Sequence, residues 1–118
     1  MKQNLEEYLI LEKLCKEVKE NISLHENECK IKILDALKKY PDAPQPQNLL
    51  GILAERHNNG IQAMAHYRAS YALSPSYRPS RRNMDRYADF NNKTKCCYMD
   101  QDCDDKEKVV DGNKGLNM

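Results

Sequence analysis

No tryptophan occurs in this chain of 118 residues, and no uninterrupted run of aliphatic residues exceeds three. Runs that short exclude a transmembrane helix and the apolar core of a signal peptide. Hydrophobic residues make up 40% of the chain and charged residues 31%. The length allows one domain with a modest core, and the polar composition predicts that part of the chain does not fold.

An excess of charge of either sign is also missing, because 19 Lys and Arg face 18 Asp and Glu. A net charge of +1 gives no bulk attraction to nucleic acid or to a membrane surface. The distribution is uneven, however. Residues 44–95 contain eight Lys or Arg and three acidic residues, whereas residues 96–118 contain three Lys and six acidic residues. A basic middle segment is therefore followed by an acidic end.

The five cysteines are odd in number and widely spaced, which argues against a disulfide framework. Together with the absence of a signal-peptide pattern, this predicts a cytoplasmic protein with reduced thiols.

Apolar residues recur at three- and four-residue spacing in five segments, and no segment shows the alternation typical of a strand. The pattern predicts an all-α fold with short connections. The expected helices cover residues 4 to about 20, 23 to about 40, about 46–57, about 61–73 and about 79–90. Ser23, with Glu26 three residues later, is expected to cap the second helix. The periodicity ends after Asn91, so residues 91–118 are expected to form a disordered, acidic, cysteine-containing tail.

Two proline positions suggest an internal repeat. Pro41 and Pro75 are 34 residues apart, and each follows a helical segment rich in Ala and Leu. A period of 34 residues is the spacing of tetratricopeptide repeats. Small residues at Gly51, Ala63 and Ser70 would let two antiparallel helices approach closely.

Segment 44–77 resembles a tetratricopeptide repeat in several further positions. Leu50-Gly51 matches the Leu-Gly pair of the family, Ala63 the small residue that opens the second helix, and Tyr67 the aromatic residue that follows. The segment departs from the family at Gln47, where Trp is frequent, and at Ala54, where Tyr is frequent. The preceding segment, 5–43, is a more divergent match.

The resemblance implies antiparallel helical hairpins stacked as a short solenoid over residues 1–90. The pairs would be 5–43 and 44–77, with a capping helix at 79–90. It also implies a non-catalytic protein–protein interaction module that binds a partner peptide or helix in a shallow groove and needs no cofactor. In this family the first helix of each pair lines the groove. The implied partner-binding residues are Gln45, Asn48, Ile52, Glu55, Arg56, Arg82, Arg86 and Asp89.

The arginines leave alternatives open. Guanidinium groups four residues apart at Arg82 and Arg86 could hold the carboxylates of an acidic peptide. The same face could instead be a solvated surface that keeps the end of the array soluble. An RNA-binding adaptor that stacks bases on nearby tyrosines is a third alternative, although we do not expect a nucleic acid partner.

The tail cysteines Cys96, Cys97 and Cys103 raise the alternative of a metal- or redox-responsive regulator. Zinc sites usually present Cys-x-x-Cys pairs and four ligands, and neither occurs here, so we expect no metal. The three histidines are scattered and form no nucleophile–base pattern, so we do not expect an enzyme. Since two repeats bury little surface, we expect either a homodimer or marginal stability.

Overall fold

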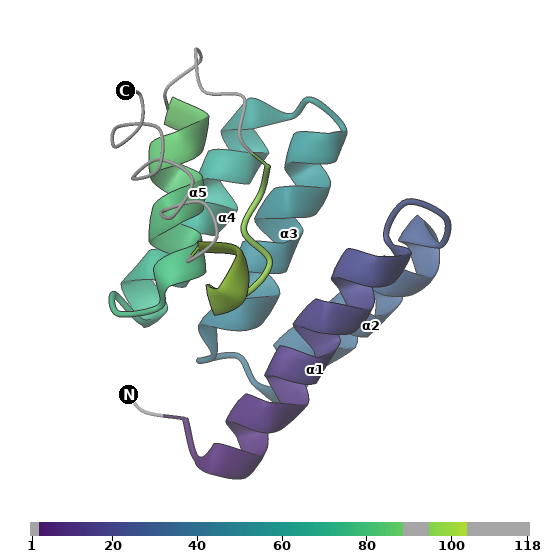
Figure 1. The fold of residues 1–118 in the computed structure, drawn as a ribbon, viewed down its shortest axis with the longest axis vertical. Coiled ribbons are helices and arrows are strands. Elements are labelled where there is room, and N and C mark those ends of the chain that lie inside the picture. The colour runs from purple at the N-terminus through teal and green to yellow at the C-terminus, as the bar shows by residue number, and fades with distance from the viewer. Residues whose placement is uncertain (1–2, 89–94, 104–118) are drawn as a thin grey trace, which may run out of the picture.

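A computed structural model describes residues 3–88 and 95–103 of the chain (Figure 1). All regular structure in this part is helical, which confirms the predicted all-α class. The helices are α1 (Leu5–Asn21), α2 (Glu26–Lys39), α3 (Pro44–Arg56), α4 (Gly60–Leu73) and α5 (Arg78–Ala88). A single further helical turn covers residues 100–103. None of the described helices is both long and apolar enough to cross a membrane.

The helix ends follow local hydrogen-bonding chemistry. Asn4 caps α1 by accepting a hydrogen bond from the Glu7 amide at 2.8 Å, and Asn59 caps α4 in the same way. Pro44 stands in the first turn of α3, where its missing N–H costs nothing. Asn58, with a φ of 57°, makes the left-handed turn that separates α3 from α4.

The predicted cap of α2 at Ser23 is wrong. The helix begins at Glu26, after His25, and has no side-chain cap. The reason is the turn that ends α1, in which the Leu24 and His25 amides both donate to the Asn21 carbonyl. Ile22 is buried and anchors this turn in the core, which leaves Ser23 outside the helix.

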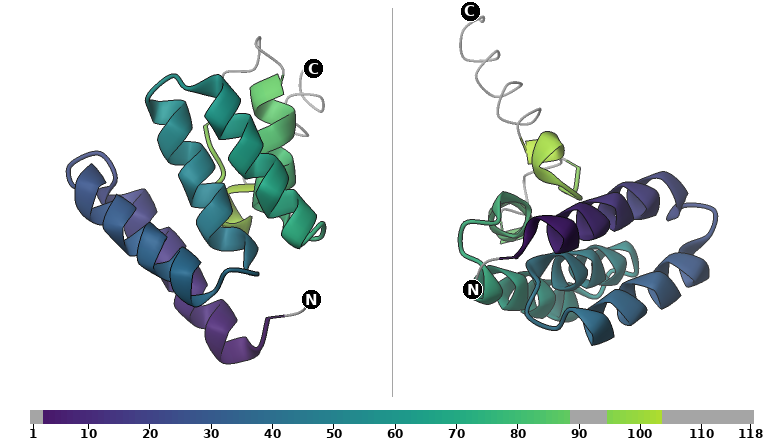
Figure 2. Two further views of the ribbon diagram at one scale, coloured as in Figure 1. Left: turned by 180° about the vertical axis from the view of Figure 1, so that it is seen from behind. Right: turned by 90° about the horizontal axis from the view of Figure 1, so that it is seen from below.

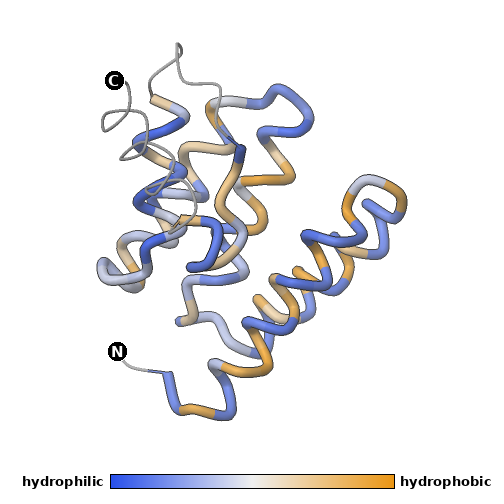
Figure 3. Tube along the Cα trace, in the orientation of Figure 1, coloured by the Kyte–Doolittle hydropathy of each residue, from blue (hydrophilic) through white to orange (hydrophobic). Residues whose placement is uncertain are grey.

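Successive helices run antiparallel and pack side by side (Figures 1 and 2). Each helix contacts the next one, and both α1 and α5 also contact α3, which makes α3 the central helix. One buried apolar cluster links the first four helices. Its fully buried members include Leu11, Cys15, Ile33, Leu49, Ile52, Ala63 and Tyr67. In contrast, α5 is hydrophilic along most of its length (Figure 3).

The closest approach of two helices in this stack is between α3 and α4. A Cβ added at Gly51 would lie only 2.4 Å from Cε1 of Tyr67. Ala63 and Ser70 on α4 are fully buried, and the Ser70 hydroxyl donates to the Pro44 carbonyl at 2.8 Å. The expectation that these small residues allow close helix packing is confirmed.

The expected disorder of the tail is wrong for residues 95–103, which we call the strap. The strap runs over α3 and α5 on the side that faces α1 (Figures 1 and 2). Cys97 is fully buried and Cys103 is 1% exposed. The rest of the predicted tail, 91–94 and 104–118, lies outside the described residues, as do the last two residues of the predicted capping helix.

Candidate functional site

The strap covers part of the face of α3 and α5 on which the family resemblance predicts an open groove. Of the expected groove residues, three have no exposed surface: Gln45, Asn48 and Ile52. The side chains of Glu55 and Arg86 are 18% and 6% exposed. Asn48 and Arg86 contact a segment of the same chain, the strap.

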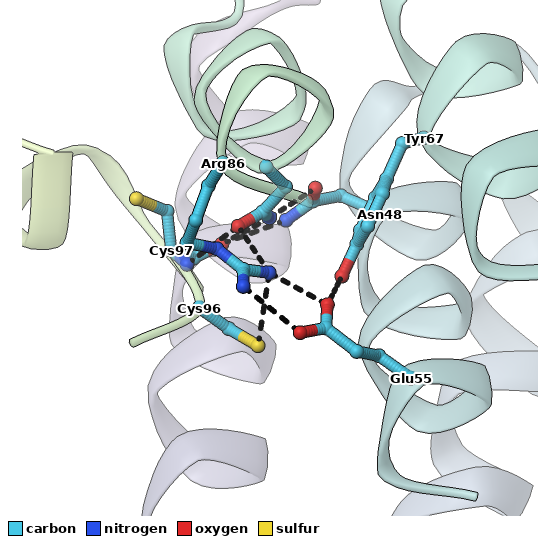
Figure 4. Close-up of polar contacts among 7 residues, drawn as sticks. Asn48, Glu55, Tyr67, Arg86, Cys96 and Cys97 are labelled. Atoms are coloured by element: carbon cyan, nitrogen blue, oxygen red, sulfur yellow. Dashed lines mark hydrogen bonds and ion pairs between the residues drawn. The ribbon is translucent and has the colours of Figure 1, made fainter. Parts of the chain in front are cut away.

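An asparagine from each of α3 and α5 holds the backbone of the strap (Figure 4). The amide nitrogens of Asn48 and Asn83 both donate to the Cys97 carbonyl, at 3.0 and 2.9 Å. In return, the Cys97 N–H donates to Oδ1 of Asn83 at 2.8 Å. The two side chains are themselves linked, because Asn83 donates to Oδ1 of Asn48 at 2.9 Å. We call this pair the asparagine clamp; it binds one residue through its backbone alone.

Asn83 was not predicted as a site residue, although its neighbour Arg82 was. A weak signal was present in the sequence. A short amide inside an expected helix is a poor helix former, because it competes for backbone hydrogen bonds, so it needs another reason to be there. Here the reason is a fully buried position facing the strap.

Beside the clamp lies a buried ion pair between α3 and α5. Arg86 donates to both carboxylate oxygens of Glu55, and the Tyr67 hydroxyl donates to Oε1 of Glu55 at 2.7 Å. Burial opposes ionisation of Glu55, but the hydrogen bonds from Arg86 and Tyr67 outweigh it and hold the pKa of this carboxyl below its usual value. Burial raises the pKa of the Tyr67 hydroxyl, which therefore stays protonated as the donor.

The strap satisfies Arg86 only in part. Nη2 of Arg86 lies 3.4 Å from the Cys96 sulfur, and a thiol is a weak acceptor. Among the described residues nothing accepts a hydrogen bond from the buried Nε of Arg86. Burial raises the pKa of Cys96 to about 11, even though the Arg86 charge opposes this shift, so the thiol is neutral at physiological pH.

The far end of the strap is attached to α1 by an ion pair between Lys19 and Asp102. The second carboxylate oxygen of Asp102 accepts hydrogen bonds from the Tyr98 and Met99 amides, at 2.9 and 3.3 Å. Asp102 thus both folds the strap into a turn and connects it to α1. Lys19 and Asp102 are 83 residues apart, and neither was predicted as a site residue.

The strap ends at a basic cavity of about 430 Å³ on α5. Arg78, Arg81 and Arg82 line it together with one acidic residue, Asp85, and with Cys103. Arg81 forms an exposed ion pair with Asp85 at 3.4 Å. Arg82 was expected in the groove with Arg86, but the structure separates the two: Arg86 is buried against Glu55, and Arg82 faces this cavity.

The remaining expected groove residues do not join this site. Gln45 hydrogen bonds with Gln3 and Glu12, Ile52 belongs to the apolar core, and Arg56 pairs with Glu26 at 3.1 Å. Asp89 lies outside the described residues.

The strap cysteines do not assemble into a metal site. Cys103 hydrogen bonds with Cys97, which raises the pKa of the Cys103 thiol, as does burial. The sulfur of Cys96 points away from that of Cys97, toward Arg86 (Figure 4). No group of three or more His, Cys, Asp or Glu side chains that could hold a metal ion is present in residues 3–88 and 95–103.

Comparison with known proteins gives no match: no protein-family model matches the chain, and no curated protein or solved structure is significantly similar to it.

Proposed function

We propose that this chain is a non-catalytic protein-interaction module of the tetratricopeptide type, which binds an extended peptide segment of a partner between α1, α3 and α5. The observation that carries the proposal is the asparagine clamp. Asn48 and Asn83 together bind both the carbonyl and the N–H of one strap residue. Side-chain amides that pair with a backbone in this way suit any extended peptide, whatever its sequence.

The helix arrangement supports the same proposal. The clamp residues stand on α3 and α5, the first helix of the second expected pair and the expected capping helix, which are the helices that the family resemblance assigns to the groove. Gly51 and Tyr67 pack α3 closely against α4, so the side chains on α3 are presented from a firmly packed helix.

An adaptor that binds RNA through its arginines is a weaker alternative. Arg86 is neutralised by Glu55, and Arg81 is paired with Asp85. Both ion pairs reduce the positive potential that phosphates would meet. The five cysteines are free thiols, which fits the reducing cytoplasm that we propose as the compartment of this protein.

Peptides selected from a random display library on the full chain would test the proposal. On addition of a selected peptide, we expect the side-chain amide NMR signals of Asn48 and Asn83 to shift, because a bound backbone would replace that of Cys97. The amide of Asn59, which caps α4 away from the groove, should stay unchanged. Peptides that bind and leave both clamp signals in place would contradict the proposal, as would a failure to select any peptide.

A further inference from the structure

We infer that the strap is an internal stand-in for the partner, and that the partner is an extended acidic peptide which displaces the strap and takes its contacts. This inference rests on the proposed function and adds to it the chemistry of the partner and a competition within the chain. It starts from the polar contacts that hold the two ends of the strap.

Cys96, Tyr98 and Met99 of the strap pack against the apolar core cluster, but the contacts that fix its course at each end are polar and can be reproduced by another peptide. At one end the asparagine clamp contacts only the backbone of Cys97. At the other end Lys19 pairs with the Asp102 carboxylate, and the Lys19 side chain is 46% exposed. A peptide that supplies an extended residue for the clamp and a carboxylate five residues later would satisfy the same groups.

The strap is also an incomplete match for the groove. It offers Arg86 a thiol in place of an oxygen acceptor, and among the described residues it leaves the Nε–H of Arg86 unpaired. A buried donor without an acceptor weakens binding. A partner with a hydroxyl or carbonyl oxygen at the position of Cys96 would bind this guanidinium better, so it could compete with a segment tethered to the same chain.

Charge complementarity indicates an acidic partner. Lys19 faces the carboxylate end of the strap, and the basic cavity lined by Arg78, Arg81 and Arg82 lies just beyond it, at Cys103. A peptide that follows the course of the strap and continues past its end would reach this cavity. Carboxylates in its last part would meet these guanidinium groups, and at Arg81 they would compete with Asp85, whose ion pair is exposed.

Competition can be tested with variants that weaken the strap and leave the groove intact. Asp102→Asn removes the charge that Lys19 binds, and Cys97→Pro removes the N–H that Asn83 accepts. The ligand is a fluorescent peptide with the sequence of residues 95–103, kept under reducing conditions and added to the full-length chain. If the strap competes with the peptide, loosening the strap raises the apparent affinity for the peptide by the factor by which the fraction of chains with a displaced strap rises.

We expect the peptide to bind the Cys97→Pro chain roughly tenfold more tightly than the wild type, and the Asp102→Asn chain roughly threefold more tightly. Glu17→Gln, which removes a carboxylate from an exposed ion pair between α1 and α2, is the matched control and should leave the affinity unchanged. In the Cys97→Pro background, Asn83→Ala should abolish most of the gain. Circular dichroism of each variant confirms that the helices are retained.

Equal affinities for the wild type and both strap variants would overturn the inference, and so would a gain that persists without Asn83. If library peptides shift the clamp signals while the strap peptide shows no such competition, the proposed function stands and only this inference fails. A wild-type dimer that Cys97→Pro converts to a monomer would also overturn it, because the occupant would then be the strap of a second copy.

Discussion

Arg86 of α5 and Glu55 of α3 form a bidentate ion pair between the two helices, with Nη1 to Oε2 at 2.9 Å and Nη2 to Oε1 at 2.6 Å. Both side chains are largely buried, and Tyr67 of α4 adds a third hydrogen bond to the same carboxylate. This pair joins α5, which contributes few apolar side chains, to the core helices. Its contribution to stability should therefore exceed that of an ordinary surface ion pair.

Replacing Arg86 should destabilise the fold, and the loss of stability should be larger when the charge is removed than when only the paired hydrogen bonds are removed. Arg86→Lys keeps the charge but cannot make both parallel hydrogen bonds, and should lower the free energy of unfolding by about 1–2 kcal/mol. Arg86→Met leaves the Glu55 carboxylate buried without its partner and should cost about 3 kcal/mol. Urea denaturation measures both values.

The matched controls are Arg81→Lys and Arg81→Met. The Arg81–Asp85 pair also lies on α5, but both side chains are more than 60% exposed. These changes should alter stability by less than about 0.5 kcal/mol. If Arg86→Met and Arg81→Met lowered the free energy of unfolding equally, the buried Arg86–Glu55 ion pair would stabilise the fold no more than the exposed Arg81–Asp85 pair.

The same pair predicts a loss of stability in acid. The pKa of Glu55 is held below its ordinary value of 4.5 in the folded chain. The stability gained from this shift is fully present above that value, and it is lost as the pH falls through the lower, folded pKa. The stability difference between the wild type and Glu55→Gln should therefore shrink as the pH falls from about 6 to about 3.

Glu12 affects the pH dependence of stability in the opposite direction to Glu55. The measured quantity should therefore be the stability difference between the wild type and Glu55→Gln, and not the stability of the wild type alone. Burial raises the pKa of Glu12, although a hydrogen bond with Gln45 opposes the shift. The stability that this raised pKa contributes is present at low pH and is lost as the pH rises through the folded-state pKa of Glu12. Because Glu12 is the same in both chains, its effect cancels, and a difference that stays constant over this range would contradict the assignment to Glu55.

The helices could be predicted from the sequence because their signals are local. Apolar spacing and the prolines gave all five segments to within a few residues, and the small residues at Gly51, Ala63 and Ser70 indicated the close packing of α3 on α4. The start of α2 was misplaced, because the burial of Ile22, which a local capping pattern does not include, decides where the turn ends.

The strap could not be predicted by the same means. It shows no helical or strand periodicity, and it belongs to a tail (residues 91–118) whose polar and acidic composition indicates disorder. What orders it are contacts with residues far away in the sequence, namely Asn48 and Lys19. Of the predicted partner-binding residues, Asn48, Glu55 and Arg86 lie together beside the strap, but nothing in the sequence showed that Arg86 pairs with Glu55 or that residues 95–103 cover this face.

Two glycine substitutions should separate close helix packing from helix propensity. At Gly51 an added Cβ would lie 2.4–2.5 Å from ring carbons of the buried Tyr67, so the ring or the helices must shift. Gly51→Ala should lower the free energy of unfolding by about 1–3 kcal/mol, despite the better helix propensity of Ala.

Gly60→Ala is the matched control. Its Cβ would approach the hydroxyl oxygen of Tyr87 at 2.8 Å. This atom is the far end of a partly exposed side chain and can move away. Thermal denaturation should show a small change for Gly60→Ala and a clear decrease for Gly51→Ala. A Gly51→Ala chain as stable as the wild type would contradict the role given to Tyr67 packing.

Thiol labelling should report on the strap residue by residue. In the wild type, labelling of Cys97 and Cys103 at about pH 8 should be slow, because both side chains are buried. The reagent cannot reach them, and burial disfavours the thiolate, which is the reactive form of a cysteine. Asp102→Asn weakens the attachment of the strap to α1, so labelling of both cysteines should become about three- to tenfold faster. Cys15 lies in the core, where burial raises the pKa of its thiol, and should keep its wild-type rate.

Mass spectrometry of the labelled chain distinguishes local opening from unfolding. If Asp102→Asn merely destabilised the whole domain, Cys15 and Cys29, which are buried in the helical core, would accelerate together with the strap cysteines. If the strap were held by apolar packing alone, no cysteine would change. Acceleration confined to the strap, absent in a Glu17→Gln control that removes an exposed ion pair between α1 and α2, would show that Asp102 keeps the strap in place through its ion pair with Lys19 and its hydrogen bonds within the strap. The core thiols act as the internal reference.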